Sequence, residues 1–269
     1  MYYGYRYLFD PTYFLIIIGV VLSLLASAKV KTTPIMYYGY RYLFDPTYFL
    51  IIIGMVLSLL ASLMVKTTFA KYSKVRSLSG LTGAQAAEKI LYSAGIYDVS
   101  VRPISGNLTD HYDPRDKTLK LSETVYNNSS VAAVGVAAHE CGHAIQDNTG
   151  YVPLRIRGAL VPIANFGATI SWPMIILGII LGWSQSLINI GIILFSLAVL
   201  FQLVTLPVEF NASRRAVQIV DETGILSTQE VKQTRQVLSA AALTYVAGAA
   251  ASILQLVRLV ILFGGRNRD

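Results

Sequence analysis

Residues 48–65 form a run of 18 positions without a charged side chain. A run of this length is at the lower limit for a helix that spans a bilayer. It is too uninterrupted for a cleavable signal peptide, so we interpret it as a signal anchor. Three further apolar stretches follow, at residues 166–183, 187–206 and 238–263. The last contains Arg258, and it is either a span whose arginine reaches the interface or a helix packed partly against protein.

The composition agrees with a membrane location. Hydrophobic residues make up 54% of the chain and charged residues 14%, whereas soluble domains carry about 25% charged residues. This balance excludes intrinsic disorder, and a single cysteine, Cys141, excludes a disulfide scaffold. The net charge of +7 is typical of basic cytoplasmic loops next to spans. We therefore expect a lipid bilayer as a partner and no nucleic acid.

Residues 1–33 recur almost unchanged at residues 36–68. Folded solenoid repeats diverge and continue for at least three units, whereas this repeat occurs twice and each copy begins with Met. Two successive spans would also place basic residues of the first copy outside, against the positive-inside rule. We interpret residues 1–35 as a near-duplicate of the anchor, from a duplication or an artefact, with Met36 as the working start.

Basic side chains follow the first apolar stretch between residues 66 and 76 and hold that end in the cytoplasm by the positive-inside rule. The expected fold class is a mainly α membrane protein. It has four working transmembrane or membrane-associated helices and a small α+β cytoplasmic domain with a short β-hairpin. The expected segments are an anchor (36–68), the α+β domain (69–160), a transmembrane hairpin (161–207), a helical segment (208–237) and a C-terminal apolar helix and tail (238–269).

Local signals place the elements of the α+β domain. A capping box, Thr82 to Gln85, opens a helix, and Val99 and Val101 alternate as in a strand. The turn 113–116 joins two segments that can pair as a hairpin. Ser129 or Ser130 then caps an Ala/Val-rich helix that runs to about residue 146.

That last helix contains an H-E-x-x-H motif, His139-Glu140-Cys141-Gly142-His143. The spacing of four puts both histidines on one face of the helix, where they can bind one Zn²⁺ per chain. Glu140 lies about 100° around the axis, off the metal and placed to act as a general base toward water. Cys141 falls on the far face, where a small buried hydrophobic side chain is expected.

The alternative is a helix with two surface histidines by accident. Apart from the motif, however, this helix is apolar up to residue 146. Burying His-Glu-His in such a helix is costly unless something pairs with these side chains, and a metal ion does so. A catalytic zinc keeps three protein ligands, so one ligand lies elsewhere. Glu209, expected to start a new helix after Pro207, is a candidate, although a first-turn acid favoured by the helix dipole explains it equally well.

Several motifs together are recognisable: LTGAQAAEKIL, LTDHYDPRDKTLKLS, VAAVGVAAHECGHAIQ, SWP and LPVEFNASRRA. Over about residues 36–262 the chain resembles the YugP-like family of bacterial membrane zinc metallopeptidases, which are distantly similar to HtpX-type proteases. The resemblance implies a zincin-like domain with a gluzincin-type site. His139, His143 and Glu209 would bind the zinc ion, and Glu140 would be catalytic.

One position departs from the HtpX-type pattern E-x-x-A-D-x-x-A. Here the stretch reads Glu209-Phe-Asn-Ala-Ser-Arg-Arg-Ala, so Ser213 replaces the aspartate. The contact that the aspartate would make to a ligand is therefore in question, and Asn211 is a possible substitute.

His111 precedes the hairpin turn and has two readings. It is either a polar flank of the turn or a hydrogen-bond donor that helps to hold the oxyanion in the cleft. Residues 119–122 are a candidate edge strand on which an extended peptide could dock.

The expected function follows from the motif and its position. Glu209 comes three residues after an apolar stretch, so a zinc ion that it binds would lie near the membrane boundary. We expect an endopeptidase that acts on membrane-associated or unfolded polypeptides at the cytoplasmic face. The rivals are a catalytically degenerate metal-binding chaperone or scaffold and a small transporter, although no span carries the paired acids typical of ion coupling.

Overall fold

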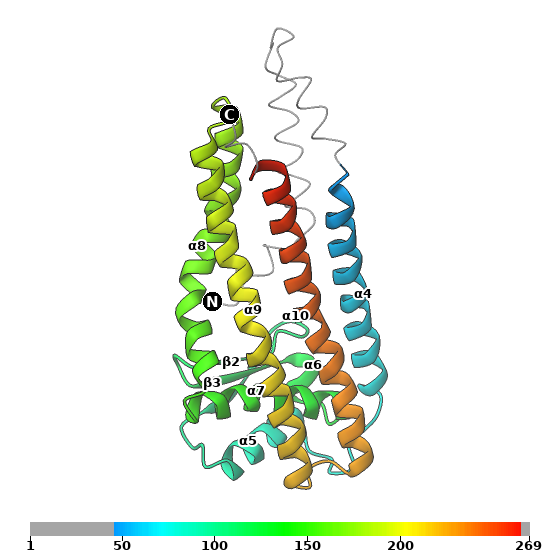
Figure 1. Cartoon of the computed structure of the whole chain (residues 1–269). Helices are drawn as coiled ribbons and strands as arrows, with labels where there is room; N and C mark the ends of the chain where they lie inside the picture. Colours follow the sequence, from blue (N-terminus) through cyan, green and yellow to red (C-terminus); the bar gives the residue numbers. More distant parts are fainter. Residues whose placement is uncertain (1–45, 265–269) are drawn as a thin grey trace. The chain divides into compact units, whose positions relative to one another are not determined.

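The computed structural model describes residues 46–264, so the interpretation of residues 1–35 lies outside it. The described chain is mainly helical with one small sheet (Figure 1). Four of its helices are long and apolar enough to cross a membrane by length and composition. They are α4 (Tyr48–Tyr72), α8 (Val152–Ile180), α9 (Gln185–Glu222) and α10 (Thr228–Phe263). The predicted mainly helical class and the four apolar helices are thus confirmed.

These helices extend well past their apolar stretches. The expectation that Glu209 starts a new helix is wrong, because α9 continues through Pro207. Proline lacks an N–H and so costs one backbone hydrogen bond, but helices with apolar surroundings tolerate such an interruption. At about 1.5 Å per residue, 38 residues exceed the roughly 30 Å hydrocarbon core. Glu209 therefore lies within the continuous helix α9, past its apolar stretch.

The described chain divides into two compact units. The first comprises residues 46–52, 162–198 and 256–264, and its small core includes Ile175, Ile188 and Leu259. Arg258 in this unit is 8% exposed and lies 4.4 Å from the ring centroid of Tyr48. Of the two readings of this arginine, packing against protein is the one that the contacts support.

The second unit comprises residues 53–161 and 199–255 and contains the small sheet. Its remaining elements are α5 (Gly83–Ser93), β1 (Ser100–Ile104), β2 (His111–Asp113), β3 (Thr118–Ser122), α6 (Glu123–Tyr126) and α7 (Val131–Asn148). The predicted hairpin is confirmed as the antiparallel pair β2–β3. The strand predicted around Val99 and Val101 is β1, which pairs with β3 in parallel.

The strand order is β1-β3-β2, so the prediction of an edge strand at residues 119–122 is wrong. Both sides of β3 are paired, and four of its five residues are buried. The sequence showed the hairpin but not that β1 would cover the other side of β3, because parallel pairing joins segments that are not adjacent in the chain. β2 is an edge of the sheet instead.

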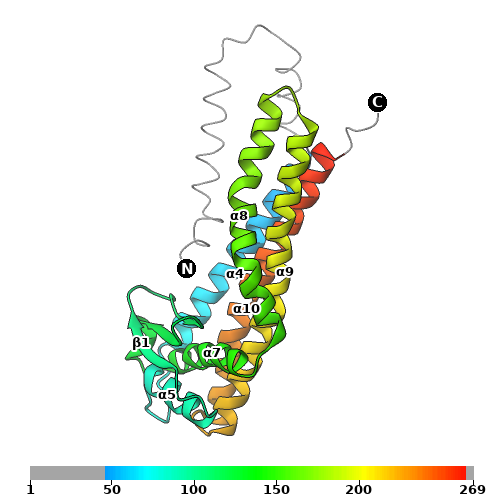
Figure 2. The ribbon, with the colours of Figure 1, turned by 90° about the vertical axis from the view of Figure 1, so that its left-hand side faces the viewer.

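Helix α7 is the centre of the second unit, and Figure 2 shows it between α5 and the long helices. The Ser130 hydroxyl caps it by accepting a hydrogen bond from Ala133 N, 3.2 Å away. Most of its side chains are buried, and they share one core with α5, the sheet and the lower part of α9. The helix that carries the H-E-x-x-H motif is thus held on several sides.

Candidate metal centre

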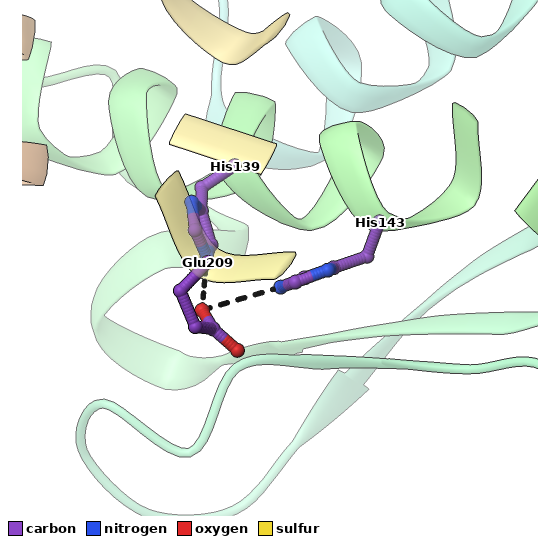
Figure 3. A group of neighbouring side chains, drawn as sticks. All are labelled: His139, His143 and Glu209. Atoms are coloured by element: carbon purple, nitrogen blue, oxygen red, sulfur yellow. Dashed lines mark hydrogen bonds and ion pairs between the residues drawn. The ribbon is translucent and has the colours of Figure 1, made fainter. Parts of the chain in front are cut away.

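The two motif histidines and Glu209 meet at the contact between α7 and α9. His139 and His143 project from successive turns of α7 toward the Glu209 carboxylate (Figure 3). Glu209 Oε2 lies 3.2 Å from His139 Nε2 and 3.5 Å from His143 Nε2. One ligand atom from each of the three residues lies within 4.8 Å of the others, which makes a group that could hold a metal ion.

The donor set of this group suits zinc. The side chains of His139, His143 and Glu209 are 13%, 9% and 2% exposed. A buried carboxylate without a cationic partner is strongly unfavourable, and two imidazole nitrogens with one carboxylate oxygen form a familiar catalytic zinc site. Three protein ligands also leave a coordination position open.

A cation that we did not identify from the sequence completes the group. Arg157, near the start of α8, places its guanidinium 3.2 Å from Glu209 Oε1. Its side chain is only 10% exposed. The two oxygens of the Glu209 carboxylate therefore have different partners: Oε2 faces the histidines and Oε1 faces the arginine. This division fixes the rotation of the Glu209 carboxylate.

The orientation of His143 is set by a chain of hydrogen bonds that begins at an arginine. Arg215 Nε can only donate, and it bonds Asn211 Oδ1 at 2.8 Å. The same oxygen accepts a bond from Gln146 Nε2 at 3.0 Å, and that nitrogen also donates to Val208 O. Gln146 Oε1 therefore faces His143 Nδ1, 3.0 Å away, and accepts a hydrogen bond from its N–H. His143 Nε2 is left with its lone pair toward the metal position, as a ligand requires.

Ser213 performs the corresponding task for the other histidine. Its Oγ lies 3.1 Å from His139 Nδ1, and the direction of this hydrogen bond depends on the tautomer of the ring. Asn211, the possible substitute, instead supports Gln146. Each histidine thus has a neutral polar group at Nδ1, and both Nε2 atoms face Glu209.

Glu140 lies beside the group, in contact with the edge strand β2. The backbone N–H of Tyr112 donates to Glu140 Oε2 at 3.1 Å. Burial raises the pKa of Glu140 to about 7, the nearby carboxylates of Asp110 and Glu209 add to the rise, and His139 opposes it. A carboxyl group with a pKa near neutrality is well suited to accept and return a proton.

The hairpin that supplies this N–H is tied to the end of α7. Tyr112 Oη donates to Asp147 Oδ2 at 2.9 Å, and Lys117 Nζ contacts the same carboxylate at 2.8 Å. On the other side, the backbone N–H of Ser122 donates to Asp110 Oδ1 at 2.7 Å. Burial raises the pKa of Asp110, and the hydrogen bonds from Ser122 oppose that rise. These contacts hold β2 against the motif helix.

Gly142 explains how α7 and α9 approach so closely. A Cβ atom at this position would lie 2.6 Å from the backbone oxygen of Ala212, a distance that a real side chain does not adopt. The adjacent Cys141 points away from the metal group, is fully buried, and contacts Ala87 O through Sγ at 3.6 Å. It is the small buried side chain that the helical geometry predicted.

Comparison with known proteins agrees with this geometry. Residues 47–264 match the family described as "Putative neutral zinc metallopeptidase". This chain belongs to that family. It is 50% identical over 202 residues to "Putative membrane protease YugP" of Bacillus subtilis (strain 168), which covers 75% of this chain and 89% of the relative. No solved structure matches the chain.

Membership of this zinc metallopeptidase family makes Zn²⁺ the expected cofactor, and the His139, His143 and Glu209 group could hold one ion. The relative and the four apolar helices together mark the chain as a membrane protein. The roles of the individual ligands and of Glu140 remain predictions.

His111 lies at the start of β2, and its Nδ1 is 2.9 Å from Thr109 O. Within residues 46–264, the group that could hold a metal ion does not include it, and its role as a hydrogen-bond donor in the reaction stays a prediction.

Sequence reasoning missed Arg157, Gln146 and the Tyr112 N–H. Gln146 had a signal, because it lies three residues after His143 on the same helix face. Arg157 had no such signal, because only the folded structure brings its guanidinium next to Glu209.

Proposed function

We propose that this protein is a membrane-embedded, zinc-dependent endopeptidase of the gluzincin type. His139, His143 and Glu209 are the metal ligands, and Glu140 is the general base. The observation that carries the proposal is the buried group of His139, His143 and Glu209, with the Glu140 carboxylate beside it and held by the edge strand β2.

Each side chain has a distinct task in this proposal. Zinc, when bound, polarises the scissile carbonyl and makes water more acidic. Glu140 accepts a proton from the attacking water and later donates it to the leaving amine. The N–H of Tyr112 holds Oε2 of this carboxylate. Among the described residues Oε1 takes part in no hydrogen bond, so this oxygen is available to take the proton.

The position of the site suggests which polypeptides reach it. Glu209 follows the apolar stretch 187–206 by three residues on the same continuous helix, so we place the zinc ion near the hydrocarbon boundary. Polypeptides that are membrane-associated or unfolded can present an extended segment at that level. The basic residues between 66 and 76 lie at the end of α4 and just after it, within the same unit as the site, which by the positive-inside rule supports a cytoplasmic location for the site.

Three matched Glu→Gln variants of the full chain, purified in mild detergent, test the mechanism. We would measure bound zinc and the cleavage of an unfolded peptide. Glu140→Gln should retain zinc and lose cleavage by about 10²- to 10⁴-fold, whereas Glu209→Gln should lose both. Glu88→Gln, at an exposed position of α5, should change neither. Cleavage by Glu140→Gln at the wild-type rate would refute the assignment of the base, and zinc retained in full by Glu209→Gln would remove that ligand.

Orientation has a separate test, because Cys141 is buried and gives little background labelling. A cysteine introduced at Leu78, which is 83% exposed, should react with an impermeant maleimide only after the cytoplasmic side is opened. Labelling in intact cells would place the site on the outer face.

A further inference from the structure

A cavity of about 670 Å³ lies between α4, α9 and α10, within the second unit and separate from the metal ligands. Polar and apolar side chains occupy different parts of its lining. The residues used below are Met64, Thr68, Asp221, Lys232, Arg235 and Leu243.

The cavity lies at the level where two apolar helices become polar. On α4 the charge-free run ends with residue 65, between Met64 and Thr68. On α10 the apolar stretch begins at residue 238, between Arg235 and Leu243. The two helices are in contact on the polar side of the cavity, where Tyr72 Oη donates to Gln236 Oε1 at 2.6 Å. The apolar end of the cavity therefore lies at the expected boundary between hydrocarbon and headgroups, and its polar end, which includes Asp221 on α9, lies on the water side of that boundary.

Two cations and one acid line its polar part. Lys232 and Arg235 are both exposed and lie about one turn apart on α10, and Asp221 faces them from α9. Within residues 46–264, none of the three forms an ion pair with another side chain. The lining thus carries a net charge of +1. An arginine fork and an ammonium group at one site suit a phosphate.

The apolar part continues as an exposed strip toward the interior of the bilayer. Above Met64 on α4, Leu57 and Leu60 are 39% and 57% exposed, and beyond Leu243 on α10, Val246 is 39% exposed. Side chains spaced at three or four residues share a helix face. A molecule with its phosphate at Arg235 can therefore lay an apolar chain along this strip.

We propose that the cavity binds one phospholipid with a single net negative charge and hydroxyl groups in its headgroup. Its phosphate meets Lys232 and Arg235, and one negative charge neutralises the net charge of the lining. A headgroup hydroxyl can donate to Asp221, which an additional anionic group could not do. A zwitterionic lipid would leave the site with its positive charge. This site is independent of the proposed protease function.

The test counts lipids retained by the full chain. Protein equilibrated with equal amounts of phosphatidylglycerol, phosphatidylethanolamine and phosphatidylcholine is analysed by native mass spectrometry. The wild type should retain phosphatidylglycerol in preference to the other two lipids. Each juxtamembrane cation favours anionic lipid by about five-fold, so the Lys232→Gln/Arg235→Gln variant should retain it roughly 25-fold less. A second variant, Ser239→Phe, fills the cavity without a change of charge and should also lower retention.

The control is Lys66→Gln/Lys74→Gln, which removes two exposed cations near the same boundary but outside the cavity. It should retain phosphatidylglycerol like the wild type. Equal losses in both double variants would show only a general attraction to basic surface and overturn the proposal. Retention by the cavity variants, or a preference for phosphatidylethanolamine, would also overturn it. Displacement of the lipid by soluble glycerophosphoglycerol would show that the headgroup binds without its acyl chains, and it would overturn the proposal of a lipid site.

Discussion

The pair formed by Arg157 and Glu209 makes a prediction about stability that depends on the metal. Both side chains are almost fully buried and their charged groups are 3.2 Å apart. Removing one partner of a buried ion pair leaves an uncompensated charge and costs about 3–5 kcal/mol. In Arg157→Met, the side chain keeps an unbranched apolar stem but the carboxylate loses this cation. We expect a cost toward the lower end of this range in metal-free protein, because His139 and His143 also stabilise the Glu209 carboxylate, and a clearly smaller cost when zinc is bound to the same carboxylate.

The assay is a comparison of thermal midpoints. Wild type and Arg157→Met are unfolded in detergent with a chelator and, separately, with saturating zinc. A loss of 3–5 kcal/mol corresponds to about 6–20 °C for a domain of this size. Other contacts of Arg157 are lost in both conditions and cancel in the difference. Arg155→Met, at an exposed position in the same helix, is the matched control and should change both midpoints by little.

Equal destabilisation with and without zinc would refute the reasoning, because Arg157 would then act by packing alone. Arg157→Lys sharpens the test. It keeps the positive charge but loses the planar fork, so its metal-free protein should be more stable than that of Arg157→Met.

Three further predictions concern the motif helix. Gln146→Leu removes the acceptor behind His143 and should lower zinc affinity by about 10–100-fold in a chelator competition; unchanged affinity would contradict the hydrogen-bond chain. Gly142→Ala brings a Cβ within 2.6 Å of Ala212 O, and thermal unfolding should show a loss of about 1–3 kcal/mol with reduced cleavage. In chelated protein the pKa of Glu140 is raised by burial from 4.5 to about 7. The protonated Glu140 side chain therefore stabilises the fold fully below about pH 4.5. The free energy of unfolding falls by about 3 kcal/mol as the pH rises from there through 7 and the buried carboxyl group loses its proton. Unfolding curves of Glu140→Gln should lack this pH dependence.

Elements with local signals were predictable from the sequence. The capping side chains of Thr82 and Ser130 begin α5 and α7 where the pattern predicted. A cap is a contact within one turn and needs no information from the rest of the chain. The continuation of α9 through Pro207 was not predictable in this way, because packing along the helix outweighs one missing hydrogen bond. The pairing of β1 with β3 was not predictable either, because these parallel strands are not adjacent in the chain.

The same distinction applies to the site. His139, Glu140 and His143 lie within one turn of one helix, so their spacing alone indicates a metal site. Glu209 is 70 residues away from His139, and the residues alone explained it equally well as a first-turn acid. Its assignment came from the family resemblance. The structure adds a physical reason, since a carboxylate that is 2% exposed between two imidazoles and an arginine is poorly explained by a helix dipole.

The contacts of Ser213 give a physical reason why a serine is compatible with this position. A histidine ligand needs an acceptor at Nδ1 to keep its lone pair on Nε2, and a neutral hydroxyl meets that need as an aspartate does. Gln146 supplies a second neutral acceptor, for His143. An aspartate at position 213 would add another negative charge near Glu209 and Glu140, whose carboxyl groups are already buried. In the proposed site the two histidines are oriented by neutral groups, and Arg157 compensates the charge of the Glu209 carboxylate. A serine at position 213 can therefore hold the His139 ring without adding a negative charge to the site.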